Sequence, residues 1–517
     1  MNVMCRSKRF GTRWVSVILF MQLWQPVRAQ WSTVFDYQGG PSTTIQGVEQ
    51  SDGAFITLTL SGLYNDRYTR YAGLVALSSE GVITEQLNVE GPNGLPGVFG
   101  LHVSPITGEF MLPGVLRDTL AFQGQNSSAL GIWIASGDLS LLEFHGTNIG
   151  ARNHFGGSSA IDAEGSCSVA AVAYEYFEDG YQAVVGAKWG ASGLLQGSDT
   201  IVQYLGYGSA HDLCALPNGR MALLAYHNTN SSPGQGSVGL FKLDNELEVL
   251  EVHPLYLVDP EQAFSLNAPF DNLDVMPLSS GNFIVGGTHS PYLDGQWRSV
   301  LQLTDPFAEP LAQHVFTSPY PVDFAAQPNC LDMGTSGNFL FCHTENTQSL
   351  YEIESGFGTP SRVHLWRMDT ALQVVGDFLF DGSMDDRYYH ATGVVNSMDG
   401  GAFVYGLCYD LNATIRRRKA WVAKIGADQF TGIQEQPHTP LTLYPNPGKD
   451  GFMLSTERVV DRAVVTICNA QGIVVQEQPL SRLNTQIQTN TLASGLYIVR
   501  LGRPDGTLVG SARWVKE

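Results

Sequence analysis

The sequence predicts an all-β chain, in which a seven-bladed β-propeller is followed by a small antiparallel β-sandwich of the immunoglobulin-like type. Three observations support this fold. A unit of about 55 residues recurs along most of the chain. Glycine (56 residues) and aromatic residues (10%) are abundant and charged residues amount to only 15%, which favours short strands and tight turns over long surface helices. Residues 441–517 no longer follow the repeat.

The N-terminal segment, residues 1–29, is predicted to be a cleavable signal peptide. A basic stretch without acidic residues precedes the apolar run Trp14–Trp24, and Val27 and Ala29 place small residues just before Gln30. The run is shorter than the roughly 20 apolar residues that span a membrane. An uncleaved membrane anchor is the alternative. No later stretch approaches that length, so we expect no transmembrane segment in the mature chain.

Removal of this segment leaves a strongly acidic protein. The whole sequence has 29 basic and 49 acidic residues and a formal net charge of −20. Five of the basic residues belong to the first 29 positions, so the mature chain carries a formal charge of −25. Because phosphate binding requires a basic surface, this charge argues against a nucleic-acid partner.

The repeat is clearest in "SSGNFIVGGTHS" and "TSGNFLFCHTEN", where Phe283 and Phe339 lie 56 positions apart. Each copy begins at a glycine-containing turn, continues as an apolar strand, crosses a variable loop and returns as a second strand. Seven copies are found, at Asp52–Gly81, Gly108–Asp138, Glu164–Gly193, Asn218–Glu246, Gly281–Asp305, Gly337–Asp369 and Gly400–Asp428. The glycines taken to mark the turns are Gly53, Gly108, Gly165, Gly219, Gly281, Gly337 and Gly401.

Each copy is predicted to hold about four strands, because a further strand-like segment precedes every turn. Four-stranded sheets repeated four to eight times around an axis form a β-propeller. Residues 30–431 are therefore predicted to be a propeller of about seven blades, and a pair of β-sandwiches is the alternative. A β-solenoid is disfavoured because its unit is normally shorter. The aromatic residues after the turns are expected to pack between blades: Phe55, Phe110, Phe283, Phe339 and Phe403.

A linker is predicted at residues 432–440, where "GIQEQPHTP" has two prolines and no apolar pattern. Alternating apolar residues then indicate a small antiparallel sandwich over residues 441–517. Five motifs follow in order: "YPNP", "GF", "NAQG", "LASGLYIVRL" and a basic end. Their principal residues are Tyr444, Pro445, Asn446, Pro447, Gly451, Asn469, Gly472, Gly495, Tyr497, Leu501 and Lys516.

With these motifs the segment resembles the type A C-terminal sorting domain of the type IX secretion system of Bacteroidetes. Trp514 departs from the family, which usually has a smaller aliphatic residue there. The resemblance implies passage through the periplasm, recognition by the outer-membrane translocon and its sortase-like peptidase, and release or attachment at the outer cell surface. An ordinary carbohydrate-binding or immunoglobulin-like module is the alternative. The preceding region also resembles generic repeat propellers of secreted proteins, which implies no activity.

Six cysteines remain in the mature chain, and one pair has the spacing of a cross-strand bridge. Cys330 and Cys342 are equidistant from Ser336, the middle of a predicted turn. On an antiparallel hairpin they would face each other within disulfide range. A disulfide between them is possible in an exported protein, and two unpaired buried thiols are the alternative.

The sequence contains no HExxH, G-x-S-x-G, Walker or Cys-x-x-Cys motif. The adjacent Asp385 and Asp386 could serve acid–base chemistry, but a solvated loop is the simpler interpretation. His102, His211 and His390 precede three of the turns and could face a central channel. Their different offsets from the turn glycines favour ordinary hydrogen-bonded histidines over a metal site. No catalytic residue, metal or other cofactor is therefore predicted.

Two functional classes remain open. The favoured one is a secreted or surface-attached propeller that binds an extracellular protein or glycan through loops on a rigid scaffold. The alternative is an extracellular polysaccharide hydrolase or lyase with its site in the propeller channel. Ionisable side chains from several blades that converge with perturbed pKa values would favour catalysis, and an exposed aromatic patch would favour binding.

Overall fold

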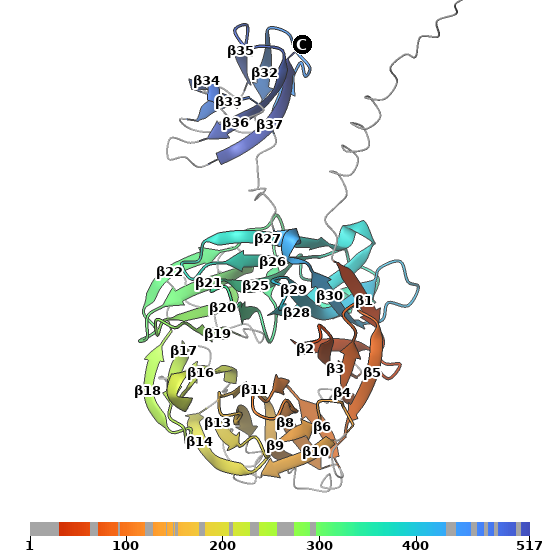
Figure 1. The fold of residues 1–517 in the computed structure, drawn as a ribbon, viewed down its shortest axis with the longest axis vertical. Helices are drawn as coiled ribbons and strands as arrows, with labels where there is room; N and C mark the ends of the chain where they lie inside the picture. The colour runs from red at the N-terminus through yellow and green to blue at the C-terminus, as the bar shows by residue number, and fades with distance from the viewer. Residues whose placement is uncertain are drawn as a thin grey trace, which may run out of the picture. The chain divides into compact units, whose positions relative to one another are not determined.

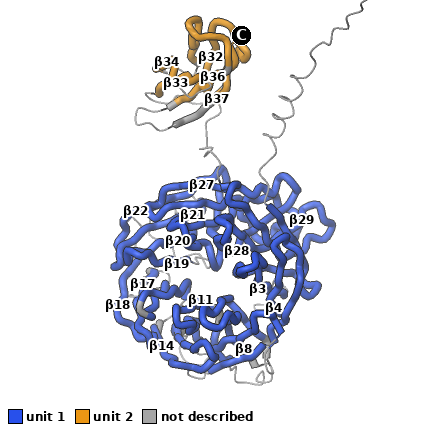
Figure 2. The backbone as a smooth tube through the Cα atoms, in the orientation of Figure 1, with its two compact units in different colours: residues 1–431 blue, residues 432–517 orange. Residues whose placement is uncertain are grey.

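The computed structural model describes two compact units, one within residues 1–431 and the other within residues 432–517 (Figure 2). The described residues are 30–62, 71–90, 94–118, 128–140, 142–147, 149, 153–174, 181–205, 210–227, 237–255, 273–289, 296–430, 441–455, 463–469, 474–479, 484–502 and 508–516. The predicted signal peptide and the predicted linker at residues 432–440 lie outside them. No helix in these ranges has the length and apolar character needed to cross a membrane.

The larger unit is all-β and propeller-like, with antiparallel sheets arranged in a ring (Figure 1). The described residues of this unit form seven such sheets. The first three along the chain contain β2 (Ser42–Glu49), β3 (Phe55–Ser61), β4 (Tyr71–Leu77) and β5 (Ile83–Val89); β6 (Gly94–Val98), β7 (His102–Val103), β8 (Phe110–Asp118), β9 (Ser128–Ala135) and β10 (Leu142–Thr147); and β11 (Asn153–Ile161), β12 (Cys167–Tyr174), β13 (Tyr181–Trp189) and β14 (Leu195–Leu205).

The next three sheets follow the same meander. They contain β15 (Ala210–Ala215), β16 (Met221–His227), β17 (Ser237–Leu243) and β18 (Val249–Pro254); β19 (Asp274–Pro277), β20 (Phe283–His289), β21 (Arg298–Thr304) and β22 (Pro310–Val315); and β23 (Asp323–Ala325), β24 (Leu331–Met333), β25 (Phe339–Glu345), β26 (Arg362–Met368) and β27 (Val374–Asp381). The short helical elements among the described residues of this unit are η2 (Pro217–Gly219), α2 (Leu350–Glu354), η3 (Gly382–Met384) and η4 (Ala427–Phe430).

The last sheet joins the two ends of this unit. It contains β28 (Arg387–Asn396), β29 (Ala402–Asp410) and β30 (Lys419–Ile425), and its fourth strand is the N-terminal β1 (Trp31–Phe35), which pairs antiparallel with β30. The indole N–H of Trp421 donates to the hydroxyl of Ser32 across this pair, at 3.0 Å. The ring is therefore closed by strands from opposite ends of the unit.

Burial differs systematically between the strands of one sheet. Every residue of β20 and β25 is buried, because neighbouring sheets cover both faces of these central strands. The fourth strands β5 and β18 are much less buried, with Val89 as their one buried residue, and they lie at the outer edge of the ring (Figure 1). The five phenylalanines expected between sheets are all buried, and the rings of Phe55 and Phe403 stack at 4.1 Å between the first and last sheets.

In each of the seven repeats, a glycine of the turn that marks the repeat adopts the left-handed backbone region, where a side chain would be strained. Six of these glycines are the ones predicted from the sequence, and the seventh lies one residue before the predicted Gly401: Gly400 has a φ of 80°, whereas Gly401 is not among the residues with positive φ. The set is Gly53, Gly108, Gly165, Gly219, Gly281, Gly337 and Gly400. The repeat is thus marked by backbone geometry as well as by sequence.

The C-terminal unit consists of two antiparallel sheets over one core. The three-stranded sheet contains β31 (Thr442–Tyr444), β32 (Gly451–Ser455) and β35 (Asn484–Gln488), and the four-stranded sheet contains β34 (Val474–Pro479), β33 (Val464–Cys468), β36 (Gly495–Gly502) and β37 (Leu508–Lys516). Both sheets contribute to the core, with Phe452 from β32, Val499 from β36 and Trp514 from β37.

Candidate functional site

The predicted sorting motif gathers around the last strand of the C-terminal unit. The segment Tyr444–Pro447 links β31 to β32 and is held by the chain end: Asn446 Oδ1 accepts from the backbone N–H of Val515 at 3.0 Å, and Asn446 Nδ2 donates to Arg513 O at 2.7 Å. The indole N–H of Trp514 donates to Pro445 O at 3.1 Å. Trp514 is buried in the core, so the residue that departs from the family pattern is integrated into the fold.

The other motif residues lie at strand ends and in the core. Gly451 and Gly495 begin β32 and β36, Tyr497 and Leu501 are buried on β36, and Asn469 follows β33. The ammonium group of Lys516 is buried and donates to Thr489 O at 2.5 Å. Gly472 lies outside the described residues. A surface cavity of about 600 Å³ adjoins this region and is lined by residues that include Tyr444, Pro445, Pro447, Lys449 and Met453.

Three carboxyl groups each link one sheet to the next sheet along the chain. Asp212 on β15, Asp274 on β19 and Asp332 on β24 each accept a hydrogen bond from the backbone of the following sheet. The bonds run from Val275 N to Asp212 Oδ2 (2.8 Å), from Leu331 N to Asp274 Oδ2 (2.7 Å) and from Asn396 N to Asp332 Oδ2 (2.6 Å). Each carboxyl group therefore satisfies an N–H of a neighbouring sheet, a structural role that uses one of its oxygen atoms.

Asp212 and Asp274 also hydrogen-bond to each other, and burial raises the pKa of both carboxyl groups above the ordinary value. The shift is larger at Asp274, where the charge of Asp212 adds to burial. Asp212 Oδ1 also accepts from the Ser158 hydroxyl at 2.8 Å. Two carboxyl groups in such contact are most stable when they share a proton, which Asp274 then donates to Asp212.

Replacing Asp274 with asparagine is expected to flatten the dependence of stability on pH. A raised pKa means that the folded chain holds a proton which the unfolded chain releases above about pH 4, so the free energy of unfolding falls as the pH rises from about 4 towards the raised pKa. Asp274→Asn keeps a donor for Asp212 and removes this loss, so the variant should exceed the wild type in stability at pH 8. Urea unfolding between pH 4 and 9 measures this, with the exposed Asp52→Asn as the control. Parallel profiles for Asp274→Asn and the wild type would contradict the shared proton.

The cysteine pair lies as the hairpin geometry requires, but both thiols are free. The backbone N–H of Cys342 donates to Cys330 O at 3.0 Å, and both side chains are buried. Burial raises the pKa of the Cys330 thiol, which also hydrogen-bonds to Asp274. The Cys330–Cys342 disulfide stays a prediction for the oxidised protein.

The other ionisable residues singled out from the sequence do not converge on one site. Asp385 and Asp386 are exposed in a turn before β28, as the solvated-loop interpretation expects, and Asp385 accepts from the Tyr389 hydroxyl at 2.6 Å. His102 Nε2 lies 2.8 Å from the Ser159 hydroxyl. Burial lowers the pKa of His102 and of His390 to about 4, so both are neutral at pH 7. Among the described residues, one cluster of side chains lies close enough together to hold a metal ion, and it includes none of His102, His211 and His390.

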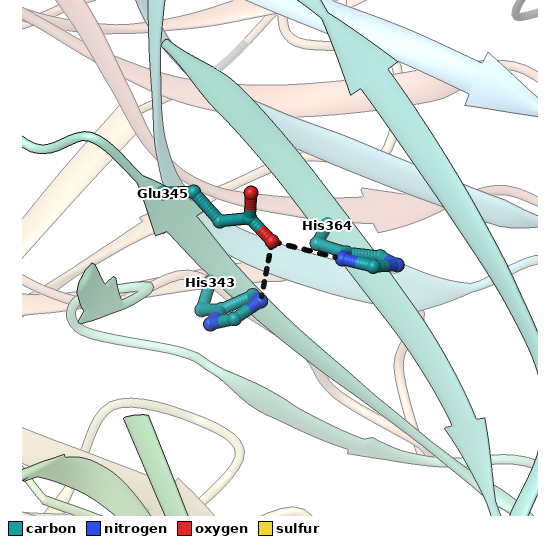
Figure 3. A group of neighbouring side chains, drawn as sticks. All are labelled: His343, Glu345 and His364. Carbon is teal, nitrogen blue, oxygen red and sulfur yellow. Dashed lines mark hydrogen bonds and ion pairs between the residues drawn. The ribbon is translucent and has the colours of Figure 1, made fainter. Parts of the chain in front are cut away.

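That cluster consists of His343, Glu345 and His364 (Figure 3), none of which was predicted from the sequence as a site residue. His343 and Glu345 are two residues apart on β25, so both side chains project from the same face of the strand. His364 lies directly opposite His343 on β26. Glu345 Oε1 is 3.2 Å from His364 Nδ1 and 3.9 Å from His343 Nε2. A His-x-Glu spacing within a strand, followed by a histidine on the next strand, is the signal that could have revealed this group.

Asp377 on β27 extends the cluster on its outer side. Its Oδ2 lies 3.0 Å from His364 Nε2, so His364 stands between two carboxylates. Burial alone lowers the pKa of His364, but the hydrogen bonds to Asp377 and Glu345 outweigh it and raise the pKa above the ordinary value. Burial and the neighbouring His364 lower the pKa of His343 well below its usual range, so His343 is neutral.

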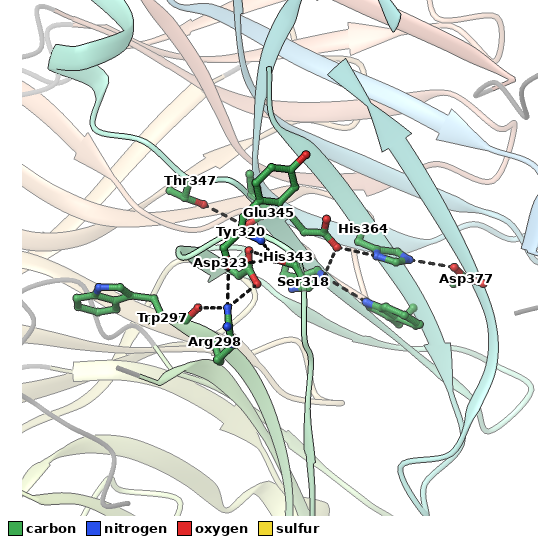
Figure 4. A network of polar contacts seen from close by, with 12 residues as sticks. Trp297, Arg298, Ser318, Tyr320, Asp323, His343, Glu345, Thr347, His364 and Asp377 are labelled. Atoms are coloured by element: carbon green, nitrogen blue, oxygen red, sulfur yellow. Dashed lines mark hydrogen bonds and ion pairs between the residues drawn. The ribbon is translucent and has the colours of Figure 1, made fainter. Parts of the chain in front are cut away.

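The surroundings of the cluster come from the preceding sheet and from β23 (Figure 4). Phe316, which directly follows β22, packs its ring against that of His343, with the ring centroids 5.4 Å apart. Asp323 lies opposite Glu345 in the β23–β25 register and accepts from the Ser318 hydroxyl at 2.8 Å. Burial raises the pKa of Asp323 to about 6, and Arg298 lies 3.6 Å from its carboxylate.

A separate surface is formed by the insertion between β25 and β26, which carries α2. Tyr351 is 74% exposed and Phe357 is 79% exposed, although both are aromatic. The insertion is nevertheless well anchored: Ser349 and Glu352 form a capping box at the start of α2, and Arg416 Nη1 donates to Ile353 O at 3.1 Å. An anchored loop with exposed aromatic rings can contact a ligand without a large loss of conformational entropy.

Comparison with curated proteins finds no match to the chain. Solved structures that resemble it include a protein of unknown function from Dyadobacter fermentans DSM 18053 (10% identity over 77% of this chain and 99% of that chain, TM-score 0.42) and a PL25 ulvan lyase (10% identity, 78% and 96%, TM-score 0.45). A GH93 α-L-arabinofuranosidase of Fusarium graminearum also resembles it (11% identity, 60% and 91%, TM-score 0.41). At these TM-scores the likenesses carry no argument about activity.

The family comparison is specific, and it covers the part of the chain in which the sequence motifs lie. The model of the secretion system C-terminal sorting domain matches residues 442–512. This range begins with β31 and reaches into β37, so it includes both sheets of the C-terminal unit. Residues 442–512 of this chain are therefore a member of the secretion system C-terminal sorting domain family, as the sequence motifs predicted.

Proposed function

We propose that this chain is a secreted or surface-attached seven-bladed β-propeller that is exported by the type IX secretion system and binds an extracellular glycan or protein. The sorting domain at residues 442–512 carries the export part of the proposal. The partners proposed for export are the outer-membrane translocon and its sortase-like peptidase. The proposed organisation is a signal peptide at 1–29, the propeller at 30–431, a linker at 432–440 and an immunoglobulin-like sorting domain at 441–517, and the division into compact units between residues 431 and 432 supports it.

The anchored insertion around α2 supports binding as the activity of the propeller. Tyr351 and Phe357 are the exposed aromatic residues of this insertion, and Arg416 fixes its backbone through the carbonyl groups of Ile353 and Gly358. Loops on a rigid scaffold commonly carry binding functions. Because the chain is acidic, contact through aromatic rings is better suited to a neutral or basic ligand than to a polyanion.

The double variant Tyr351→Ala/Phe357→Ala is expected to lose retention on the ligand while keeping the fold of the wild type. The measurement is a screen of the purified mature chain against extracellular polysaccharides and envelope proteins, with both retention and released products recorded. Tyr71→Ala is the matched control, because Tyr71 is also exposed (54%) but lies at the start of β4. Retention that is equal in the double variant and the wild type would contradict a role for the insertion.

A hydrolase or lyase remains the alternative function, and one observation favours it. The carboxyl groups of Asp212, Asp274 and Asp332 come from three sheets, and burial raises the pKa of each. Raised pKa values of this kind are common at catalytic sites. Because each of these carboxyl groups accepts a hydrogen bond from the backbone of the next sheet, we favour the structural role. Released oligosaccharides that disappear in Asp332→Asn would support the alternative.

A further inference from the structure

The cluster of His343, Glu345 and His364 has the composition of a metal site with three protein ligands. Two imidazoles and one carboxylate are a donor set that suits Zn²⁺ and related divalent transition metals. One ligand atom from each residue lies within 4.8 Å of the other two. In a tetrahedral zinc site with bonds of about 2.0–2.1 Å, ligand atoms are about 3.3 Å apart. The distances of 3.2 and 3.9 Å from Glu345 Oε1 to the two imidazoles are close to that spacing.

The backbone already holds the three ligands together. His343 and His364 are partners in the antiparallel register of β25 and β26, and Glu345 is two residues beyond His343 on the same face. In Figure 3 the carboxylate of Glu345 lies between the two imidazole rings. Small side-chain movements would therefore suffice to bring the three ligand atoms around one ion.

Asp377 occupies the place of an outer partner for one ligand. Metal-bound histidines almost always donate their other ring N–H to a carboxylate or carbonyl, which fixes the ring and its tautomer. His364 Nε2 has such a partner in Asp377 Oδ2, at 3.0 Å, so Nδ1 is left to face Glu345. A carboxylate on β27 therefore already holds the histidine on β26 in the orientation that a metal-bound histidine needs.

The imidazole ring of His343 is poorly hydrogen-bonded, although it is buried. His343 is 1% exposed, and its Nδ1 has no hydrogen-bond partner among the described residues. Its Nε2 accepts only a long bond, 3.3 Å, from the indole N–H of Trp366. A buried imidazole is normally better satisfied than this. An ion at Nε2 would replace the long indole contact with a coordination bond.

The local charge also favours a cation. Glu345 and Asp377 place two carboxylates around His364, whereas the nearby Arg298 and Arg362 have their own acidic partners in Asp323 and Asp381. The two carboxylates exceed the single positive charge that His364 can carry. A divalent ion would neutralise both. Asp377 is the most exposed member of the group, with 24% of its side chain accessible, and this side offers a path for the ion.

We propose that His343 Nε2, Glu345 Oε1 and His364 Nδ1 bind a divalent transition-metal ion, with Zn²⁺ as the best-suited ion and Asp377 as the positioning residue for His364. The ion would cross-link β25 and β26 within the sheet that carries the α2 insertion. This site is independent of the sorting domain and of ligand binding, because none of its residues belongs to either surface.

The test uses the full mature chain without an affinity tag, freed of metal with a chelator and titrated with ZnCl₂. Calorimetry is expected to show one equivalent of Zn²⁺ bound, and the melting temperature is expected to rise with zinc concentration. His364→Gln should abolish stoichiometric binding, and Asp377→Asn should weaken it by roughly 10- to 100-fold. His253→Gln should bind as the wild type does, because His253 pairs with Glu251 at the surface of another sheet.

A measurement on the unmodified chain guards against misfolded variants and against binding by the cysteines. Co²⁺ in place of Zn²⁺ should give the visible absorption of a four- or five-coordinate ion without the near-ultraviolet band of a cobalt–thiolate bond. Absence of stoichiometric Zn²⁺ binding, a thiolate band, or equal binding in folded His364→Gln would each overturn the proposal.

Discussion

Removal of residues 441–517 is expected to abolish export and to leave the protein in the periplasm. The family match covers residues 442–512, and a translocon that reads this domain has no substrate once it is gone. The larger unit keeps all its sheets in this variant, because the two compact units divide between residues 431 and 432. Fractionation of the native host, followed by immunoblotting of periplasm, cell surface and medium, measures the outcome.

The control for this truncation is a substitution that leaves the sorting domain intact. Tyr351→Ala lies in the propeller-like unit and should be exported as the wild type is. If the truncated chain still reached the surface or the medium, residues 441–517 would not be the signal for export. Periplasmic degradation of the truncated chain is detected by comparison with total protein in a protease-deficient host, where folded truncated chain should accumulate.

The second large effect is expected at the ring closure, where Phe403→Ala should destabilise the propeller-like unit by about 3–5 kcal/mol. The Phe403 ring is buried and stacks on the ring of Phe55, with the ring centroids 4.1 Å apart. It also meets the ring of Trp31 edge to face, at a centroid distance of 5.8 Å. Its loss opens a cavity between the first and last sheets, at the junction that joins the two ends of the unit. Urea unfolding followed by intrinsic fluorescence is expected to show a lower midpoint.

Phe357→Ala is the matched control for that substitution, because it removes the same ring from a side chain that is 79% exposed. It should leave the unfolding midpoint nearly unchanged. Equal midpoints for Phe403→Ala and the wild type would mean that closure does not depend on this stacked pair.

The repeat was predictable from sequence because each copy is local: a turn glycine and the apolar residues after it recur within one short segment. The seventh glycine was misplaced by one because "DGGAF" offers two adjacent candidates, and only the backbone conformation of Gly400 distinguishes them. The fourth strand of the last sheet was not predictable in this way. β1 pairs with β30, almost 400 residues further along the chain, and no local pattern encodes so distant a partner.

The candidate sites also differ in whether their residues are close together in the sequence. The sorting motif is a linear pattern, so sequence alone was enough to recognise the family. The His343, Glu345 and His364 cluster depends on the register between β25 and β26. This register could not be predicted from the sequence, because the insertion between the two strands obscures which residues pair. The carboxyl groups of Asp212 and Asp274 likewise meet only because their sheets are neighbours in the ring.

The most direct test of the central claim is whether residues 432–517 are sufficient for export. A periplasmic reporter enzyme with its own signal peptide is fused to these residues and expressed in the native host. Reporter activity is predicted at the cell surface or in the medium, and a fusion with residues 442–517 in scrambled order should stay in the periplasm. A folded, active fusion that carries residues 432–517 and remains in the periplasm would contradict the assignment of this unit as the export signal.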